Sequence, residues 1–241
     1  MKFDDSLEFD SAMVIFAHPD DAEWMCAGTV AAWTGAGVDV TYLLVTNGAS
    51  GSKDKDMTRE KLAAIRIEEQ RAACDVLGVK TLVPLGFEDG YLYPDLDLRK
   101  AVAREVRRTR PEVVIAHDPT VRTVQNIYFN HPDHIAVGEV SLRSINPDAS
   151  SGLMFPELWH EEGFEPFEPK AMFLSSFFEG DVLVDITATM DRKIEALMRH
   201  ESQVADPAGT SSWARDQFKL IGARGGYEYA EAFRRFTLGI V

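Results

Sequence analysis

Two short clusters of histidine and aspartate have the residue types that hold a catalytic metal ion. The first is His18–Asp21 (His-Pro-Asp-Asp), directly after the apolar run 13–17, and the second is His131–His134 (His-Pro-Asp-His). Imidazole and carboxylate groups suit zinc, and a metal that activates water needs about three protein ligands and one open position. We therefore predict that the two clusters meet around one metal ion.

Spacing within the clusters separates the expected ligands from the other polar groups. His18 and Asp21 lie three residues apart where a strand gives way to a helix, so both side chains can converge on one ion. His131 and His134 are also three apart, and near a helix start they can face one side. We assign the metal to His18, Asp21 and His134. Asp20 points elsewhere and remains free.

The remaining polar residues have the chemistry of proton transfer. Asp20 is the expected general base, because a metal lowers the pKa of bound water towards ~7 and a carboxylate can then take its proton. His131, oriented by Asp133, is the expected imidazolium that stabilises an oxyanion or protonates a leaving amine. These roles predict hydrolysis through a tetrahedral intermediate.

The same residues also have a more ordinary interpretation. Aspartates after strands commonly cap helices, which would explain Asp21, and His131 would then simply cap a turn. However, four of the six histidines lie at or just after predicted strand ends, namely His18, His117, His131 and His134. Ligands of parallel sheets collect at this edge. Two such clusters therefore favour a functional site over capping alone.

Composition places the chain among ordinary globular proteins. Its 241 residues suffice for one domain spanning 1–241, and 45% of them are hydrophobic and 27% charged. The formal charge of −14 argues against nucleic acid or an anionic membrane surface as the main partner. No apolar run approaches the ~20 residues of a membrane span, and the N-terminus lacks a signal-peptide pattern, so we expect a cytoplasmic protein. Cys26 and Cys74 form no CxxC pair and are expected in the core.

Apolar runs and helical periods alternate along most of the chain. This alternation predicts an α/β fold, a Rossmann-like and mostly parallel sheet with helices on both faces, in a single domain. Neither a GxGxxG nor a P-loop pattern is present, so a nucleotide site has no support. The segment 146–169 is irregular and is expected either as a lid over the site or as packed surface. The expected strands are 11–17, 38–45, 81–85, 112–116, 171–175 and 182–186, and the expected helices are 22–34, 56 or 58 to 77, 95 or 97 to 110, 132–142, 187 or 189 to 198, 213–221 and 227–236.

The clusters and their setting resemble the PIG-L family of zinc-dependent deacetylases, also called LmbE-like. The family signatures are Ala-His-Pro-Asp-Asp after the first strand, matched by Ala17–Asp21, and His-Pro-Asp-His, matched by His131–His134. Either motif alone is only suggestive, whereas the ordered pair on a matching strand and helix pattern is specific. The resemblance continues in segments 28–29, 46–48, 66–78, 85–90, 184–193 and 200–203.

The resemblance implies a fold, a reaction and a set of site residues. It implies a Rossmann-like domain that uses one Zn²⁺ per chain to hydrolyse the N-acetyl group of an N-acetylglucosamine-type sugar or its conjugate. It assigns the zinc to His18, Asp21 and His134, the base to Asp20 and an assisting role to His131. The expected partner is thus a small N-acetylated sugar, and the sequence is compatible with either a monomer or a homo-oligomer.

Other functions and some details stay open at this stage. A metallo-phosphoesterase and a non-catalytic sugar-binding protein on the same fold are the alternatives, although no second set of metal ligands is evident. Where many relatives carry a glutamate after Thr-Asn-Gly, this chain has Ala49. Within the loop 120–130, substrate contact is expected from Arg122, Gln125 and Asn126. Arg66 and Glu69, one helix turn apart, are expected to form a structural ion pair, with substrate contact as the alternative. Glu23 is expected to have a minor helix-start role.

Overall fold

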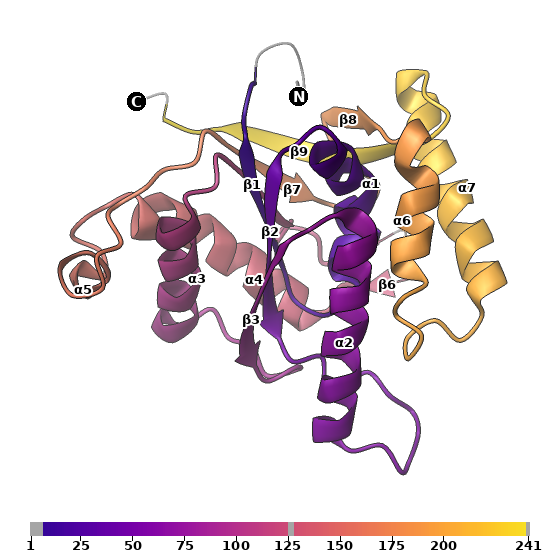
Figure 1. Cartoon of the computed structure of the whole chain (residues 1–241), viewed down its shortest axis with the longest axis horizontal. Helices are drawn as coiled ribbons and strands as arrows, with labels where there is room; N and C mark the ends of the chain where they lie inside the picture. The colour runs from indigo at the N-terminus through magenta and orange to yellow at the C-terminus, as the bar shows by residue number, and fades with distance from the viewer. Residues whose placement is uncertain (1–6, 125–127, 240–241) are drawn as a thin grey trace.

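The fold is built on a central seven-stranded sheet. The computed structural model describes residues 7–124 and 128–239. The strands of the sheet are β1 (Ser11–Phe16), β2 (Asp39–Thr46), β3 (Thr81–Phe87), β4 (Val113–His117), β7 (Ala171–Ser175), β8 (Val182–Asp185) and β9 (Ala230–Thr237). Their order is β3-β2-β1-β4-β7-β9-β8 (Figure 1). The five strands from β3 to β7 pair in parallel, and β9 runs antiparallel to both of its neighbours. The predicted, mostly parallel sheet is confirmed.

Alternate residues of the central strands build two apolar cores, one on each face. Val14 and Phe16 of β1 pack with α1 (Asp21–Gly35) and α2 (Arg59–Leu77). Met13 and Ile15 pack on the other face with α3 (Leu96–Thr109) and α4 (Pro132–Arg143). This period of two in continuous apolar strands is typical of a sheet buried on both sides. Figure 1 shows the helices on either side of the sheet.

The C-terminal part of the chain forms a smaller core against α1 and α2. The helix α6 (Met190–Leu197) follows a short 3₁₀ turn at Thr187–Thr189 and packs on both of these helices, and α7 (Pro207–Gly225) packs on β8 and β9. The shared apolar residues of this core are Ile186, Met190, Ile194, Ala214, Phe218, Ile221, Ala230 and Ala232. No helix within 7–124 and 128–239 has the length and apolar character that crossing a membrane requires.

One predicted element is wrong. The tail 227–236 was expected to be helical, but residues 230–237 form β9, inserted between β7 and β8. Gly226, with a φ of 77°, ends α7 and redirects the chain. The backbone groups of β9 then find partners on both sides, and this pairing outweighs the weak helical pattern of its sequence.

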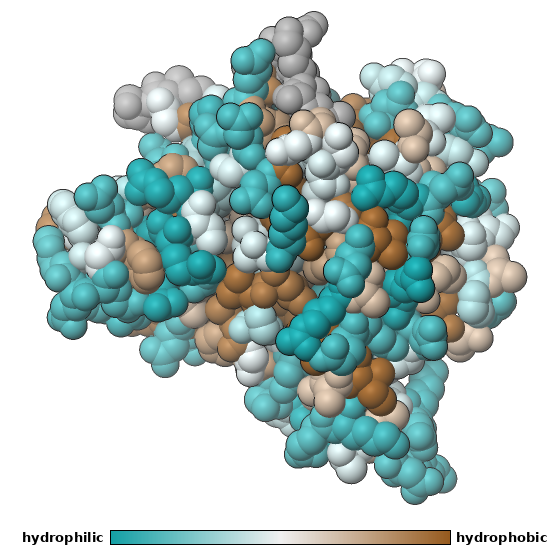
Figure 2. Space-filling view, viewed as in Figure 1, coloured by the Kyte–Doolittle hydropathy of each residue, from teal (hydrophilic) through white to brown (hydrophobic). Residues whose placement is uncertain are grey.

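The opposite end of the sheet is an open edge. The edge strand β3 contains Pro84, which is tolerated only where one side of a strand needs no ladder hydrogen bond. Several of its side chains are only partly buried, and Figure 2 shows a hydrophobic area on the face where β3 lies.

The irregular segment 146–169 packs against α3. A π-helical turn, Ser144–Ala149, leads into it, and it contains a short helix, α5 (Pro156–His160). The buried guanidinium of Arg107 donates hydrogen bonds to the carbonyl oxygens of Asp148, Ser151 and Met154 at 2.7–2.8 Å. Arg99 forms a bidentate pair with the Asp148 carboxylate, at 2.7 and 2.8 Å. These contacts satisfy the backbone of a segment that has little regular structure of its own.

Candidate metal centre

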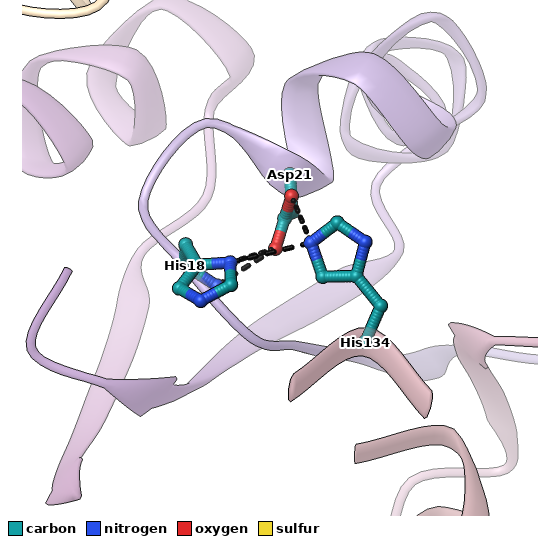
Figure 3. A group of neighbouring side chains, drawn as sticks. All are labelled: His18, Asp21 and His134. Atoms are coloured by element: carbon teal, nitrogen blue, oxygen red, sulfur yellow. Dashed lines mark hydrogen bonds and ion pairs between the residues drawn. The ribbon is translucent and has the colours of Figure 1, made fainter. Parts of the chain in front are cut away.

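His18, Asp21 and His134 converge at the carboxyl ends of β1 and β4 (Figure 3). The Asp21 carboxylate lies 3.2 Å from Nδ1 of His18 and 3.1 Å from Nε2 of His134, and the two ring nitrogens are 3.2 Å apart. Ligand atoms of a tetrahedral zinc site, with bonds of about 2.0–2.1 Å, lie about 3.3 Å from one another. The donor atoms and their spacing therefore fit a single metal ion.

Local sequence places each of these side chains. His18 lies two residues after the end of β1, and Asp21 is the first residue of α1, with its carboxylate accepting a hydrogen bond from the His18 backbone N–H at 2.7 Å. His134 lies in the first turn of α4, which approaches β4 closely at Gly138. A Cβ there would lie 2.6 Å from the carbonyl oxygen of His117, so only glycine allows this approach.

The second ring nitrogen of each histidine has a hydrogen-bond acceptor. Nε2 of His18 lies 3.2 Å from the Asp133 carboxylate and 3.1 Å from that of Asp89. Nδ1 of His134 lies 3.0 Å from the amide oxygen of Asn130. Acceptors in these positions take the ring N–H and leave the other nitrogen free to bind metal. Sequence reasoning had assigned no role to Asp89 or Asn130, although Asn130 directly precedes the second cluster.

Electrostatics around Asp21 suits a metal ligand. Burial alone would raise the pKa of the Asp21 carboxyl, but His134, His117 and His18 hold that pKa well below its usual range. His117 stacks on the ring of His134, with centroids 4.3 Å apart and planes at 9°. Burial and the nearby His134 lower the pKa of His117 to about 4, so it is a neutral ring beside the ligands.

Asp20 lies beside the ligands without being one of them. It has a left-handed backbone, with φ 96°, which is rare for a residue with a Cβ and typical of strained functional sites. Its backbone N–H donates to Gln70 at 3.1 Å, and its carboxylate lies 3.4 Å from the guanidinium of Arg66. Burial raises the pKa of Asp20 to about 6, against the opposing effect of Arg66.

The structure changes the expected relation of His131 to Asp133. Nδ1 of His131 accepts a hydrogen bond from the backbone N–H of Asp133 at 3.2 Å. The Asp133 carboxylate instead accepts from the backbone N–H of Gly90 at 2.7 Å and from Nε2 of His18. Burial lowers the pKa of His131, with the neighbouring His18 acting in the same direction. His131 is therefore set up as a neutral ring with its proton on Nε2.

Arg66 and Glu69 do not pair with one another, which corrects the expected ion pair. The buried Arg66 guanidinium donates to the carbonyl oxygens of Pro19 and Gly48, and so joins the two loops that follow β1 and β2. Glu69 accepts hydrogen bonds from the backbone and hydroxyl of Ser202, each at 2.7 Å. Helical spacing permits a pair between Arg66 and Glu69. The buried loop carbonyl oxygens need hydrogen-bond donors, however, and the Arg66 guanidinium supplies them.

Glu23 has a larger role than the expected helix-start residue. It is fully buried, and its carboxylate accepts hydrogen bonds from Gln70 at 3.1 and 3.2 Å and lies 3.0 Å from Nε2 of His200. Gln70 in turn holds the backbone of Asp20. Through Gln70, Glu23 thus helps to position Asp20, the residue expected to act as the general base.

A buried ion pair provides hydrogen-bond partners for the backbone at a break in α1. The helix is interrupted at Cys26, with φ −152° and ψ 15°. The Lys193 ammonium donates to the carbonyl oxygens of Glu23 and Trp24 and pairs with Glu231 at 2.7 Å. The Glu231 carboxylate accepts from the backbone N–H groups of Gly28 and Thr29, at 2.9 and 2.8 Å. The pair therefore satisfies the backbone groups that the break leaves open.

A cavity of about 430 Å³ opens beside the ligands. One end is formed by Asp20, Asp21, His117 and His134. No residue of 146–169 is among its described lining residues, which gives no support to a lid role for that segment. Gln125 and Asn126, expected to contact substrate, lie outside the described residues. The rest of the lining is Trp24, Met25, Val124, Tyr128, Ser175, Phe177, Phe178, Trp213, Gln217 and Phe218.

Asp133→Asn is expected to weaken metal binding at this site about 10–100-fold, the range for partners that orient a ligand. An amide NH₂ facing Nε2 of His18 would favour the tautomer that protonates Nδ1, the atom facing the metal. Competition with a chelator measures the affinity, with the exposed Asp56→Asn as control. Equal affinities in Asp133→Asn and the wild type would show that the Asp133 carboxylate does not orient His18.

Comparison with known proteins gives a consistent assignment. The PIG-L family model, described as GlcNAc-PI de-N-acetylase, matches residues 13–145. Diacetylchitobiose deacetylase of Thermococcus kodakarensis is 30% identical over 95% of this chain and 83% of its own length. A probable N-acetyl-alpha-D-glucosaminyl L-malate deacetylase 2 of Bacillus anthracis is 30% identical over 80% of this chain and 81% of its own.

A solved structure supports the same assignment. The N,N'-diacetylchitobiose deacetylase from Pyrococcus horikoshii superimposes with a TM-score of 0.88 at 27% identity, covering 95% of this chain and 85% of that one. The PIG-L family model matches more than half of the chain, and the Thermococcus relative aligns over nearly all of it. This chain belongs to the PIG-L family.

Proposed function

We propose that this protein is a zinc-dependent hydrolase that removes the acetyl group from an N-acetylglucosamine-type sugar or sugar conjugate. The observation that carries the proposal is the convergence of His18, Asp21 and His134 beside a cavity that Asp20, Asp21 and His134 line. The relatives are named as deacetylases of diacetylchitobiose and of an N-acetylglucosaminyl malate, both N-acetylated sugars. The bond cleaved is then a linear amide C–N bond.

Zinc is the proposed metal because of the donor set. Two imidazoles and one carboxylate form a common catalytic zinc set, and three protein ligands leave a position open. When bound, such an ion polarises an amide carbonyl and lowers the pKa of the attacking water. A second group of possible metal ligands is His18 with His131 and Asp133, and it shares His18 with the first group. The Asp133 carboxylate of this second group already accepts a hydrogen bond from the Gly90 N–H. We therefore propose one zinc ion per chain.

The protein's own groups account for the proton transfers. Asp20, partly buried and with a pKa of about 6, takes the proton from the attacking water as the new C–O bond forms. His131 donates its Nε2–H to the carbonyl oxygen, on which negative charge develops. Asp20 then returns the proton to the amine nitrogen as the C–N bond breaks, releasing acetate and the free amino sugar. Arg66 stabilises the ionised form of Asp20 between turnovers.

A panel of small substrates tests the proposal. Purified protein with added zinc is incubated with N-acetylglucosamine, diacetylchitobiose and simple N-acetylglucosaminides, and acetate and free amine are both measured. We expect equal amounts of the two products from at least one of these sugars. Phosphate release from sugar phosphates without acetate release would favour a phosphoesterase, and no release from any substrate would favour a binding protein. Either result would overturn the proposal.

A further inference from the structure

Much of the cavity lining is apolar, and the proposed reaction does not use it. Five aromatic side chains and one methionine form this apolar part, which we call the aromatic wall: Trp24, Met25, Phe177, Phe178, Trp213 and Phe218. They come from α1, from the segment after β7 and from α7. Beyond the metal end, the hydrogen-bonding side chains among the described lining residues are Tyr128, Ser175, Gln217 and the indole N–H groups of Trp24 and Trp213.

The wall is tied to the metal centre and is held in place. Trp24 lies one helical turn after the ligand Asp21, and its carbonyl oxygen accepts from Lys193 at 2.9 Å. Its ring packs edge-on against Trp213, with centroids 5.6 Å apart and planes at 73°. Phe177 has a left-handed backbone, with φ 63°, and packs edge-on against Tyr128 at 5.7 Å. Two edge-on aromatic pairs thus line the cavity.

Charge in the cavity is of one sign. The charged side chains among its described lining residues are Asp20 and Asp21, apart from the histidines, and neither lysine nor arginine is among them. The Lys193 ammonium lies 4.0 Å from the centre of the Phe218 ring, but it is fully buried and paired with Glu231. A phosphate or carboxylate packed against the aromatic wall would lose its hydration without gaining a lysine or arginine partner from the described lining, and would share the cavity with the Asp20 carboxylate.

The size of the cavity leaves room beyond one sugar ring. A volume of about 430 Å³ lies within the range of pockets that enclose drug-sized ligands, about 300–1,000 Å³. A second sugar ring would bring several hydroxyl groups to a wall that has few hydrogen-bond partners, and unpaired buried hydroxyls are costly. An apolar group meets no such penalty there.

We propose that the substrate carries an uncharged aryl or alkyl group beyond its sugar ring, and that this group packs against the aromatic wall. The inference rests on the proposed deacetylase function and names its substrate class. The apolar group has two chemical sources, an aglycone on the anomeric carbon or an N-acyl chain longer than acetyl. In either case the wall makes the site selective for neutral, apolar conjugates.

A series of matched substrates tests this selectivity. We compare kcat/KM for methyl and phenyl N-acetylglucosaminides, N-acetylglucosamine 1-phosphate, diacetylchitobiose and the N-hexanoyl analogue of the methyl glycoside. Burial of an apolar group the size of a phenyl ring is expected to raise kcat/KM about 10–100-fold over the methyl glycoside. A gain for the phenyl glycoside places the apolar group on the anomeric side, and a gain for the N-hexanoyl compound places it on the acyl side.

Variants in α7 distinguish packing of the substrate against the aromatic wall from a general loss of activity. Trp213→Ala is expected to bring the ratio of phenyl to methyl kcat/KM close to one, whereas Trp159→Ala, on the distant α5, keeps the wild-type ratio. Gln217→Arg supplies the missing cation and is expected to raise kcat/KM for the 1-phosphate relative to the methyl glycoside. This gain does not depend on the stability of Trp213→Ala.

The outcomes distinguish this inference from the function on which it rests. Acetate release from all the glycosides with equal kcat/KM, or a preference for the 1-phosphate or for diacetylchitobiose over both apolar compounds, overturns the inference and leaves the deacetylase function standing. An unchanged ratio in Trp213→Ala also overturns it. No free amine from any compound, whether its acyl group is acetyl or hexanoyl, means that the function itself has failed.

Discussion

Asp20→Asn is expected to lower kcat for acetate release by about 10²–10⁴-fold, the usual contribution of a general base, with the metal content unchanged. Asparagine has the same shape and can still accept from Arg66, but it cannot take a proton from water. Asp20 lies outside the group His18, Asp21 and His134, so its loss should not release the metal.

The control for this variant is Asp97→Asn, on the first turn of α3, which keeps the total charge change the same. Steady-state kinetics and metal analysis of both purified proteins give the comparison. Near-normal turnover in Asp20→Asn would show that another group is the base. Loss of metal from Asp20→Asn would instead show that Asp20 is a ligand.

Lys193→Met is expected to lower the free energy of unfolding by about 3–5 kcal/mol, the cost of removing one partner from a buried ion pair. Lys193 and Glu231 are both fully buried, so methionine would leave the Glu231 carboxylate without its cation. The carbonyl oxygens of Glu23 and Trp24 would lose their donor as well. The first turn of α1, which carries Asp21 and Trp24, is then expected to loosen.

Denaturant unfolding measures this effect, and Lys219→Met on the exposed face of α7 is the matched control. A surface lysine of this kind is expected to change stability by no more than about 0.5 kcal/mol. The double variant Lys193→Met with Glu231→Gln should recover part of the loss, because no unpaired charge remains. A loss below about 1 kcal/mol in Lys193→Met would show that the pair does not hold α1 together.

Local patterns in the sequence predicted the parallel sheet and the convergence of the two clusters. The apolar run before His18 predicts a buried strand, and strands of a parallel sheet end at one edge, so residues after β1 and after β4 meet there. The structure brings together His18, Asp21 and His134, the three residues assigned to the metal. The strand ends and one rule of topology predicted that the clusters meet, whereas the spacing fits His131 as well as His134, and the family resemblance favours His134.

Tertiary contacts explain what the sequence did not predict. Lys193 and Glu231 look like surface charges in isolation, and only the break in α1 creates the backbone groups that they satisfy. The Asp133 carboxylate faces His18 rather than its neighbour His131, because the turn at Gly90 packs against it. The strand β9 depends on partners far away in the chain, which its own residues do not reveal.

Titration of the metal-stripped protein with zinc tests most directly that His18, Asp21 and His134 hold the ion on which the reaction depends. Acetate release from an N-acetylglucosaminide is followed after each addition. We expect no turnover without metal, full recovery at one zinc per chain, and no recovery in His134→Ala at the same zinc concentration. Turnover that persists in the stripped protein, or full recovery in His134→Ala, would contradict this assignment.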